Sequence, residues 1–193
     1  MSAERAAGLE RYERIILGID PGTNVMGFGI LGVMARKACL IDLGSLKMVR
    51  TETHYLRLKR IFDYTRDLCE RFLPDELAIE APFYGKNVQS MLKLGRAQGV
   101  AMAAALSRDI PVCEYEPRKI KQAITGNGAA SKEQVQSMLK HILGIAESRL
   151  PHELDATDAL AAALCHFYES GKPVVARSGS WKDYIAKHPD KIR

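Results

Sequence analysis

Four acidic residues stand where the chain leaves a predicted strand or enters a predicted helix. Asp20 ends an apolar, β-branched run and is followed at once by a Pro-Gly turn, and Glu80 ends a second, shorter apolar run. Open α/β sheets place their sites at the carboxyl ends of their strands, so parallel neighbours would bring these two carboxylates together. Asp155 and Asp158 are three residues apart and share one face of a predicted helix. That helix would bring them to the other two acids.

Carboxylates gathered in one place repel one another, which does not favour stability. A hard divalent cation relieves the repulsion, and Mg²⁺ is held by a few carboxylates together with water and substrate phosphate. Two such ions ~3.5–4 Å apart stabilise both the attacking and the leaving oxygen of a phosphodiester. Each part also has a simpler interpretation: Asp20 caps its turn, and the helix pair complements the helix dipole. The four acids together favour a metal site.

The hydrophobic pattern predicts the elements that must position these acids. Apolar runs predict strands, and periods of three and four predict helices. The strands are expected over 15–20, 25–31, 38–48, 76–80 and 110–115, and the helices over 53–72, 89–107, 117–124, 131–144 and 153–169. Three strands in quick succession predict an antiparallel meander at the start of the sheet. The result is one α/β domain with the order β-β-β-α-β-α-β-α-α-α.

Glycines at two places predict close packing. Gly27 and Gly29 interrupt the second strand, where a neighbouring element is expected to approach the backbone. Gly95, Gly99 and Ala103 are four residues apart in the helix over 89–107. Glycine inside a helix costs about 1 kcal/mol relative to alanine, so this row of small residues predicts a closely packed helix face.

Composition is that of an ordinary soluble globular protein. The chain has 193 residues, of which 47% are hydrophobic and 26% charged. No apolar segment reaches the ~18 residues that cross a bilayer, and the first 14 residues are charged rather than signal-like. The four cysteines are widely spaced without metal-ligand spacing, which is typical of reduced core thiols in a cytoplasmic protein.

The net charge of +5 is unevenly distributed. Residues 171–193 hold six basic and two acidic side chains, so this segment alone supplies +4. Residues 86–140 hold nine basic and four acidic side chains, which permits a polyanionic partner without requiring one. We expect a flexible lead-in over 1–13, a folded domain over 14–170 and a basic, loosely ordered tail over 171–193.

Five motifs occur in the order and spacing of a known family. They are Ile19-Asp20-Pro21-Gly22, Ile79-Glu80 followed by Phe83 and Lys86-Asn87, Lys119-Ile120-Lys121-Gln122, Ser131-Lys132-Glu133-Gln134-Val135, and Asp155-Ala-Thr-Asp158-Ala-Leu-Ala. Over about residues 14–167 the chain closely resembles the RuvC family, the bacterial Holliday-junction resolvases of the RNase H-like superfamily.

The resemblance implies an RNase H-like fold: a five-stranded mixed sheet of three antiparallel strands followed by parallel strands, flanked by helices. It further implies a homodimer that resolves four-way junction DNA by paired symmetric nicks in DNA recombination and repair. Two Mg²⁺ ions per site are expected, with Mn²⁺ as a substitute, and 5′-phosphate ends as products. The implied partners are junction DNA and the RuvA–RuvB branch-migration complex, with no membrane.

The resemblance also assigns roles to individual residues. Asp20, Glu80, Asp155 and Asp158 match the family's catalytic, metal-binding acids, although some members have histidine at the position of Asp155. Lys132 is assigned to catalysis beside the scissile phosphate. The predicted DNA-binding residues are Phe83, Lys86, Arg118, Lys121 and Lys132.

Simpler interpretations of these basic and aromatic residues remain open. Lys121 and Lys132 also suit a solvated helix face. Phe83 lies in a turn beside Glu80, where an exposed ring would stack on an unpaired base or, alternatively, cover the core.

Three other functions fit parts of the pattern. The turn Asp20-Pro21-Gly22-Thr23 matches the first phosphate loop of actin-like ATPases and sugar kinases, but those proteins need two such domains and a second Asp-x-Gly-Thr is absent. A non-catalytic junction- or RNA-binding module is expected to lack one of the four acids. A related nuclease acting on RNA would keep both the fold and the metal site.

Overall fold

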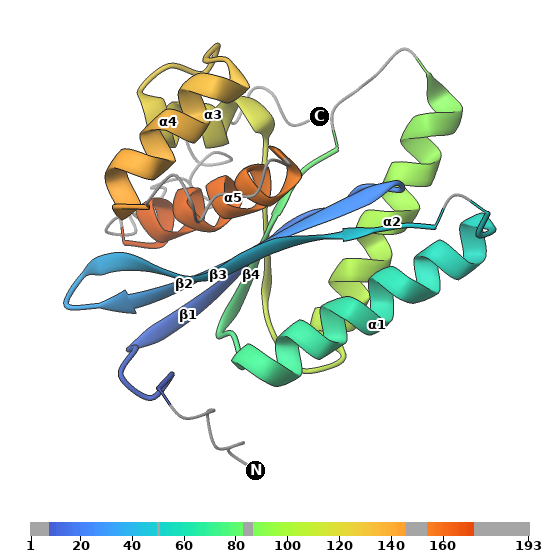
Figure 1. Cartoon of the computed structure of the whole chain (residues 1–193), viewed down its shortest axis with the longest axis horizontal. Coiled ribbons are helices and arrows are strands. Elements are labelled where there is room, and N and C mark those ends of the chain that lie inside the picture. Colours follow the sequence, from blue (N-terminus) through green and yellow to red (C-terminus); the bar gives the residue numbers. More distant parts are fainter. Residues whose placement is uncertain (1–7, 50, 83–86, 146–153, 172–193) are drawn as a thin grey trace, which may run out of the picture.

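A five-stranded mixed sheet runs through the middle of the molecule (Figure 1). The computed structural model describes residues 8–49, 51–82, 87–145 and 154–171. The strands are β1 (Arg14–Asp20), β2 (Val25–Met34), β3 (Lys37–Lys47), β4 (Glu76–Glu80) and β5 (Val112–Tyr115), in the spatial order β3-β2-β1-β4-β5. The pairs β1–β2 and β2–β3 are antiparallel, and β1–β4 and β4–β5 are parallel. The predicted meander and the mixed sheet are confirmed.

Helices cover both faces of the sheet, which makes three layers (Figure 1). Helices α1 (His54–Phe72) and α2 (Val88–Leu106) cover one face. Helices α3 (Pro117–Thr125), α4 (Lys132–Leu143) and α5 (Leu154–Ser170) lie on the other. The observed order of elements is the predicted one.

Local sequence signals set the helix ends. The side chain of Thr53 caps the first turn of α1, and Asn87 caps α2 through the backbone N–H of Ser90 at 3.1 Å. Ser131 and Gln134 form the predicted capping box of α4, which satisfies two first-turn donors reciprocally. The expected stops after α3 and α4 are glycines in the left-handed conformation.

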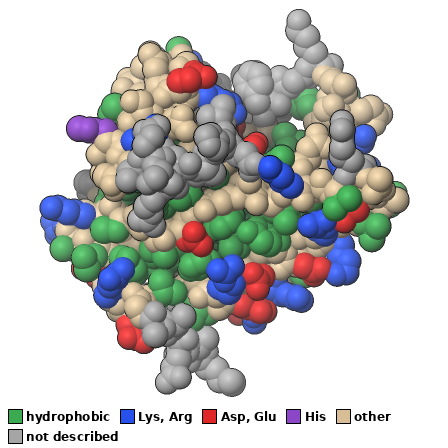
Figure 2. All heavy atoms as spheres, viewed as in Figure 1, with side chains coloured by type: hydrophobic (Ala, Val, Ile, Leu, Met, Phe, Trp, Pro, Cys, Tyr) green, Lys and Arg blue, Asp and Glu red, His purple; other side chains and the backbone are tan. Residues whose placement is uncertain are grey.

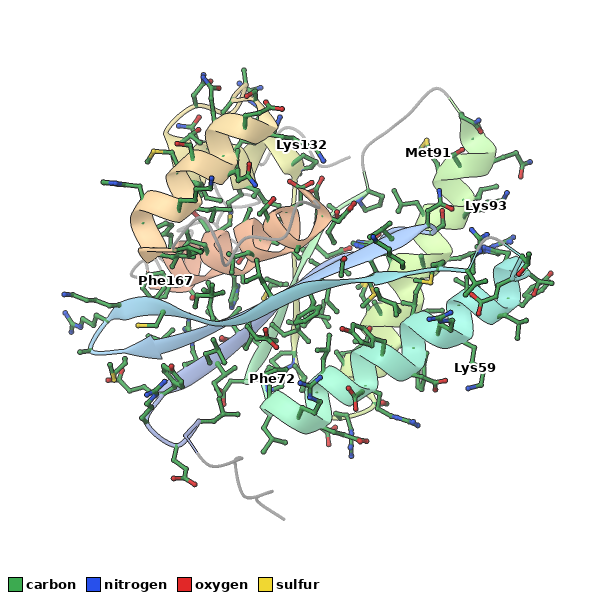
Figure 3. The ribbon with its side chains drawn as sticks, in the orientation of Figure 1. Lys59, Phe72, Met91, Lys93, Lys132 and Phe167 are labelled. Carbon is green, nitrogen blue, oxygen red and sulfur yellow. The ribbon has the colours of Figure 1, made fainter. Side chains whose placement is uncertain are left out.

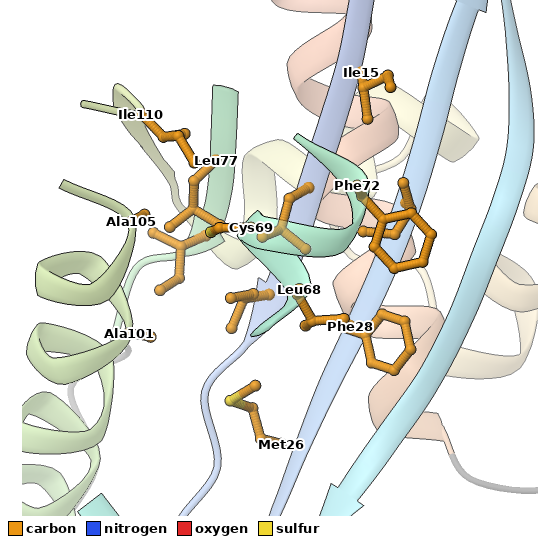
Figure 4. Packing of buried hydrophobic residues seen from close by; sticks show 14 of the residues in the cluster. Ile15, Met26, Phe28, Leu68, Cys69, Phe72, Leu77, Ala101, Ala105 and Ile110 are labelled. Atoms are coloured by element: carbon orange, nitrogen blue, oxygen red, sulfur yellow. The ribbon is translucent and has the colours of Figure 1, made fainter. Parts of the chain in front are cut away.

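The sheet separates two hydrophobic cores because β1 is buried on both faces. Ile15, Leu17 and Ile19 point toward α1 and α2, where Leu68, Cys69, Phe72, Ala101 and Ala105 meet them (Figure 4). Ile16 belongs to the opposite core, with the inner face of α5. Leu9 and Tyr12, from the segment expected to be a flexible lead-in, are buried in the first core. The full division into lead-in, domain and tail stays a prediction.

Glycines in the sheet let α5 lie directly on β1 and β2. A Cβ built on Gly18 would stand 2.0 Å from the carbonyl oxygen of Ala159, and one on Gly29 would stand 2.7 Å from the Cα of Leu160. At Gly27 the obstructing atom is the carbonyl oxygen of Asp155, at 1.9 Å. The close approach predicted for Gly27 and Gly29 is confirmed, and it sets the height of α5 above the sheet.

Within the described part of this chain, the close packing predicted for the glycines of α2 is not found. Gly95 and Gly99 are exposed, and no atom lies within 4 Å of a Cβ built on either one. The buried face of α2 is instead formed by Ala97, Gln98, Ala101, Ala104 and Ala105. The outer face also exposes Val88, Leu92 and Leu106, at 65%, 52% and 54%. The small residues therefore lie on an uncovered surface of the chain.

A buried polar cluster fixes the far end of α5. The hydroxyl of Tyr115 lies 2.7 Å from Nδ1 of His166, and Nε2 of His166 lies 3.3 Å from the carboxylate of Glu76 at the start of β4. Burial lowers the pKa of His166. Among the described helices, none is long and apolar enough to cross a membrane, and all four cysteines are free.

Candidate active site

Strand register brings the first two acids to one edge of the sheet. In the parallel pair β1–β4, Ile19 is opposite Ile79, so Asp20 and Glu80 leave their strands side by side. Asp20 is also opposite Gly27 in the antiparallel pair β1–β2. Because the backbone of Asp155 lies directly over Gly27, the first turn of α5 sits above the end of β1. The bare backbone at Gly27 thus brings the helix acids to the strand acids.

These side chains form a pocket of about 270 Å³. The acids that line it are Asp20, Glu80 and Asp158, and the bases are Lys121 and Lys132. Pro117, Ile120, Val135 and Ala161 form its apolar wall. Five of the predicted site residues, from two strands and three helices, therefore share one cavity.

The carboxylates strongly perturb one another. Burial, followed by the charges of Glu80, Asp158 and Asp155, raises the pKa of Asp20 to about 7. Burial and the charge of Asp158 also raise the pKa of Glu80. A raised carboxyl pKa means that the ionised form lacks compensation, as expected where like charges are desolvated together. The pocket holds more negative charge than its own lysines offset.

Lys132 pairs with Asp158 across the pocket mouth. Its Nζ donates to Oδ2 of Asp158 at 2.5 Å, and the side chain extends from α4 toward the first turn of α5 (Figure 3). Burial lowers the pKa of Lys132, but the hydrogen bond and the charge of Asp158 outweigh burial and leave that pKa raised. Lys132 is therefore a cation held beside the acids.

Asp155 stands slightly apart from the other three acids. It is half-buried and does not line the pocket, yet its charge contributes to the raised pKa values of Asp20 and Lys132. The four predicted acids thus form one electrostatic group, and three of them face the same space.

Donor chemistry suits a hard divalent cation. Carboxylate oxygens are the ligands that Mg²⁺ prefers, and uncompensated repulsion at Asp20 and Glu80 is the condition that such an ion relieves. Among the described residues, no three acidic, histidine or cysteine side chains already surround a common point. The side chain of Asp158 is directed to Lys132 instead.

One polar residue that sequence patterns did not single out supports the site. Gln98 is 4% exposed on the inner face of α2, and its Nε2 donates to the backbone carbonyl of Glu80 at 3.3 Å and to the carboxylate of Glu114 at 2.6 Å. It ties the ends of β4 and β5 together behind the edge that carries the acids. The sequence signal that could have identified Gln98 is its position as a polar residue among the buried alanines of α2.

The remaining predicted DNA contacts are placed less completely. Arg118 is exposed on α3, where its side chain packs along the loop at Gly128, outside the lining of the acidic pocket. Phe83 and Lys86 lie outside the described residues. Their predicted roles stay predictions.

Carboxylates at the ends of adjacent central strands, completed by an acidic helix on a β3-β2-β1-β4-β5 sheet, define a nuclease of the RNase H-like class. The family model described as "Crossover junction endodeoxyribonuclease RuvC" matches residues 16–166. The chain belongs to the RuvC family. The RuvC of Porphyromonas gingivalis is 58% identical over 185 residues, covering 94% of this chain and 98% of that protein. The RuvC of Christiangramia forsetii is 56% identical over 194 residues, covering 100% of both.

Solved structures agree with this assignment. Thermus thermophilus RuvC in complex with Holliday junction substrate superposes with a TM-score of 0.74 at 36% identity, covering 81% of this chain and 95% of that chain. The yeast mitochondrial Holliday junction resolvase Ydc2 has a TM-score of 0.57 at 13% identity and covers 79% of this chain and 78% of that chain. The second likeness concerns the fold alone.

Proposed function

We propose that the chain is a structure-selective endonuclease that resolves four-way DNA junctions in recombination and repair. The observation that carries the proposal is the pocket in which Asp20, Glu80 and Asp158 meet Lys121 and Lys132. Membership of the RuvC family supports junction DNA as the substrate. This assignment displaces the ATPase and kinase interpretation of the Asp-x-Gly-Thr turn.

Each site would hold two divalent metal ions, Mg²⁺ with Mn²⁺ as a substitute. Their ligands would be Asp20, Glu80, Asp155 and Asp158. When bound, the metal supplies Lewis-acid stabilisation of the phosphodiester oxygens and an activated water. The raised pKa values of Asp20 and Glu80 support this assignment, because an added cation offsets the repulsion that raises them. Hydrolysis in this site would leave 5′-phosphate and 3′-hydroxyl ends.

Lys121 and Lys132 would meet the scissile phosphate. Both line the acidic pocket, so a phosphate bound there lies beside two ammonium groups. Fixed positive charge stabilises the negative charge that accumulates on phosphoryl oxygens in the transition state. The ammonium of Lys132, already oriented by Asp158, loses little freedom in taking this position.

Paired nicks require two acidic pockets, and each chain carries one described here, so we assign the active form to a homodimer. Phe83, Lys86 and Arg118 are proposed to contact the junction, with Phe83 stacking on its unpaired bases. By the family resemblance, the RuvA–RuvB branch-migration complex is the expected partner, in the cytoplasm. The nuclease unit is proposed to span residues 14–170, with Leu9 and Tyr12 of the preceding segment packed on its core.

A nicking assay tests the function. The purified chain should cut a synthetic four-way junction with Mg²⁺ and leave matched duplex, single strand and RNA–DNA hybrid largely intact. EDTA should stop the cutting. Asp20→Asn, Glu80→Gln and Asp155→Asn should each abolish nicking but keep junction binding, whereas Asp67→Asn, an exposed change on α1, should leave both unchanged.

Preferred cutting of the RNA–DNA hybrid would replace the proposal with the related RNA nuclease. Near-normal nicking by one of the three site variants at saturating Mg²⁺ would remove that residue from the site. Nicking that persists in EDTA would exclude the metal assignment.

A further inference from the structure

A second pocket lies at the same edge of the sheet, on the side of α1 and α2. It has a volume of about 390 Å³ and is lined by Thr23, Asn24, Glu52, His54, Arg57, Ser90 and Lys93. Figure 3 shows Lys93 on the opposite side of the strand ends from Lys132. Thr23 and Asn24 belong to the turn that begins at Asp20, so one turn borders both pockets.

The lining is cationic, and its one acid is already engaged. The two carboxylate oxygens of Glu52 accept from Arg60 at 3.0 Å and from the backbone N–H of Val49 at 3.2 Å. Arg57 donates to the neutral oxygens of Thr23 at 3.1 Å and Asn24 at 2.9 Å. Among the described residues, no carboxylate lies within 4.0 Å of the ammonium of Lys93.

Several positive groups converge on His54. Burial, then the charges of Arg96, Lys93 and Arg57, lower the pKa of His54. Its Nε2 is shielded from solvent and has no hydrogen-bond partner among the described residues. Helices α1 and α2 both begin here, and neither has an acid in its first turn. Two helix N-termini add further positive potential to the side-chain charges.

Basic residues on the outer face of α1 are paired with acids. Along the outer face of α1, basic and acidic side chains alternate (Figure 2), with Lys59 paired to Asp63 and Arg66 to Glu70 at 3.8 Å. An ordinary solvated helix face has this composition. Lys93 differs because it lines a cavity and no carboxylate among the described residues lies within 4.0 Å of its ammonium.

We propose that this second pocket binds a non-scissile backbone phosphate of the junction, a proposal that rests on the proposed function. A strand whose scissile phosphate occupies the acidic pocket can pass over the turn at 20–24, because that turn borders both cavities. A phosphate held on the far side of the turn fixes the position of the strand. The pocket thereby sets which phosphodiester reaches the acids.

Replacing single charged phosphates of the DNA by neutral methylphosphonates tests this contact. Junctions carrying one methylphosphonate at successive positions are bound in EDTA to the full-length parent chain, Lys93→Met and Lys59→Met. Lys59 is the control, because it is an exposed lysine of the same layer whose charge is paired. The loss of one phosphate contact should reduce the magnitude of the log–log salt slope by about 0.9 in Lys93→Met only.

The expected result is also specific to position. One methylphosphonate near the cleavage site should weaken binding by the parent and by Lys59→Met, but add nothing to the loss in Lys93→Met. Equal slopes for the two variants, or the same methylphosphonate penalties in all three proteins, would overturn the proposal. Failure of the parent to nick the junction in Mg²⁺ would instead count against the proposed function, so the two failures are distinguishable.

Discussion

Ionisation of Asp20 in the folded chain costs stability. Its carboxyl pKa is about 7 rather than the ordinary 3.8, so the folded state binds more protons than the unfolded state between these values. Stability must therefore fall as the pH rises through this window, and the full penalty applies above about pH 7. Three pKa units correspond to a penalty on the order of 4 kcal/mol. The acid is retained for chemistry rather than for the fold.

Asp20→Asn should consequently stabilise the metal-free protein. In EDTA its melting temperature should exceed that of the parent at pH 8, and the difference should shrink as the pH falls and vanish toward about pH 3, below the ordinary pKa of 3.8, where Asp20 is protonated in both states. Thermal unfolding followed by circular dichroism at both pH values measures the effect. Asp67→Asn serves as an exposed control, and an Asp20→Asn protein that melts no later than the parent at pH 8 would contradict the raised pKa.

Residue types alone revealed the acids but not their surroundings. Asp20 and Glu80 were predictable because each ends an apolar run, and Asp158 because it follows Asp155 by one helical turn. Gln98 was not predictable as a support for Glu80, since its partners come from β4 and β5, 18 and 16 residues away respectively. The convergence of Arg57 and Lys93 was hidden for the same reason, because only tertiary structure brings α1 and α2 together.

The position of helix α5 depends on the absence of side chains at the glycines of β1 and β2. A Cβ on Gly27 would lie 1.9 Å from the carbonyl oxygen of Asp155, so alanine there must push the first turn of α5 away by at least about 1 Å. A displacement of this size in a catalytic group can reduce the rate 10²-fold. Gly27→Ala should therefore lower the single-turnover nicking rate by about that factor, and it should also lower the melting temperature.

The control is Asp67→Asn, an exposed change on α1 away from α5. That change should leave both the melting temperature and nicking close to those of the parent. Both rates are measured on the same four-way junction in Mg²⁺. A Gly27→Ala protein that nicks at the parental rate would show that α5 does not set the geometry of the site.

Elements were predicted well where the hydrophobic period was uninterrupted. The helix over 53–72 and the capping box at 131–134 correspond closely to α1 and α4. Strand β2 runs to Met34 rather than residue 31, because its pairing with β3 continues beyond an irregularity at Ile30 and Leu31. The spacing of the small residues in α2 predicted a closely packed helix face. Spacing alone does not reveal whether another element of the same chain covers that face.

The whole molecule is arranged around one edge of its sheet. Strands β1 and β4 deliver acids there, and α5 closes the acidic pocket on one face. Helices α1 and α2 begin at the same edge and enclose the cationic pocket on the other face. Acids that would hold metal and bases that would hold the DNA backbone are thus separated by the sheet, yet they are joined through the turn after Asp20.

The uncovered face of α2 is the surface we assign to the proposed homodimer. Leu92 and Leu106 are more than half exposed there, and open space at Gly95 and Gly99 permits close approach of a second helix. Burying apolar area of this kind stabilises association by roughly 25 cal/mol per Å² before the costs of association. A charge in the middle of the face would have to be desolvated without a partner.

Leu92→Glu should therefore shift the protein toward monomer, as measured by sedimentation equilibrium, whereas Met34→Glu, an exposed change on the β2–β3 hairpin, should not. The monomer keeps a complete acidic pocket, so it should still bind metal. It should cut single strands of the junction without the coupling that gives two symmetric nicks.

Paired nicking is scored on a supercoiled cruciform plasmid, where two nicks within one binding event give linear product and one nick gives open circle. A parental chain that sediments as a monomer would contradict the homodimer itself, and a dimeric Leu92→Glu protein with parental linear product would move the interface away from α2.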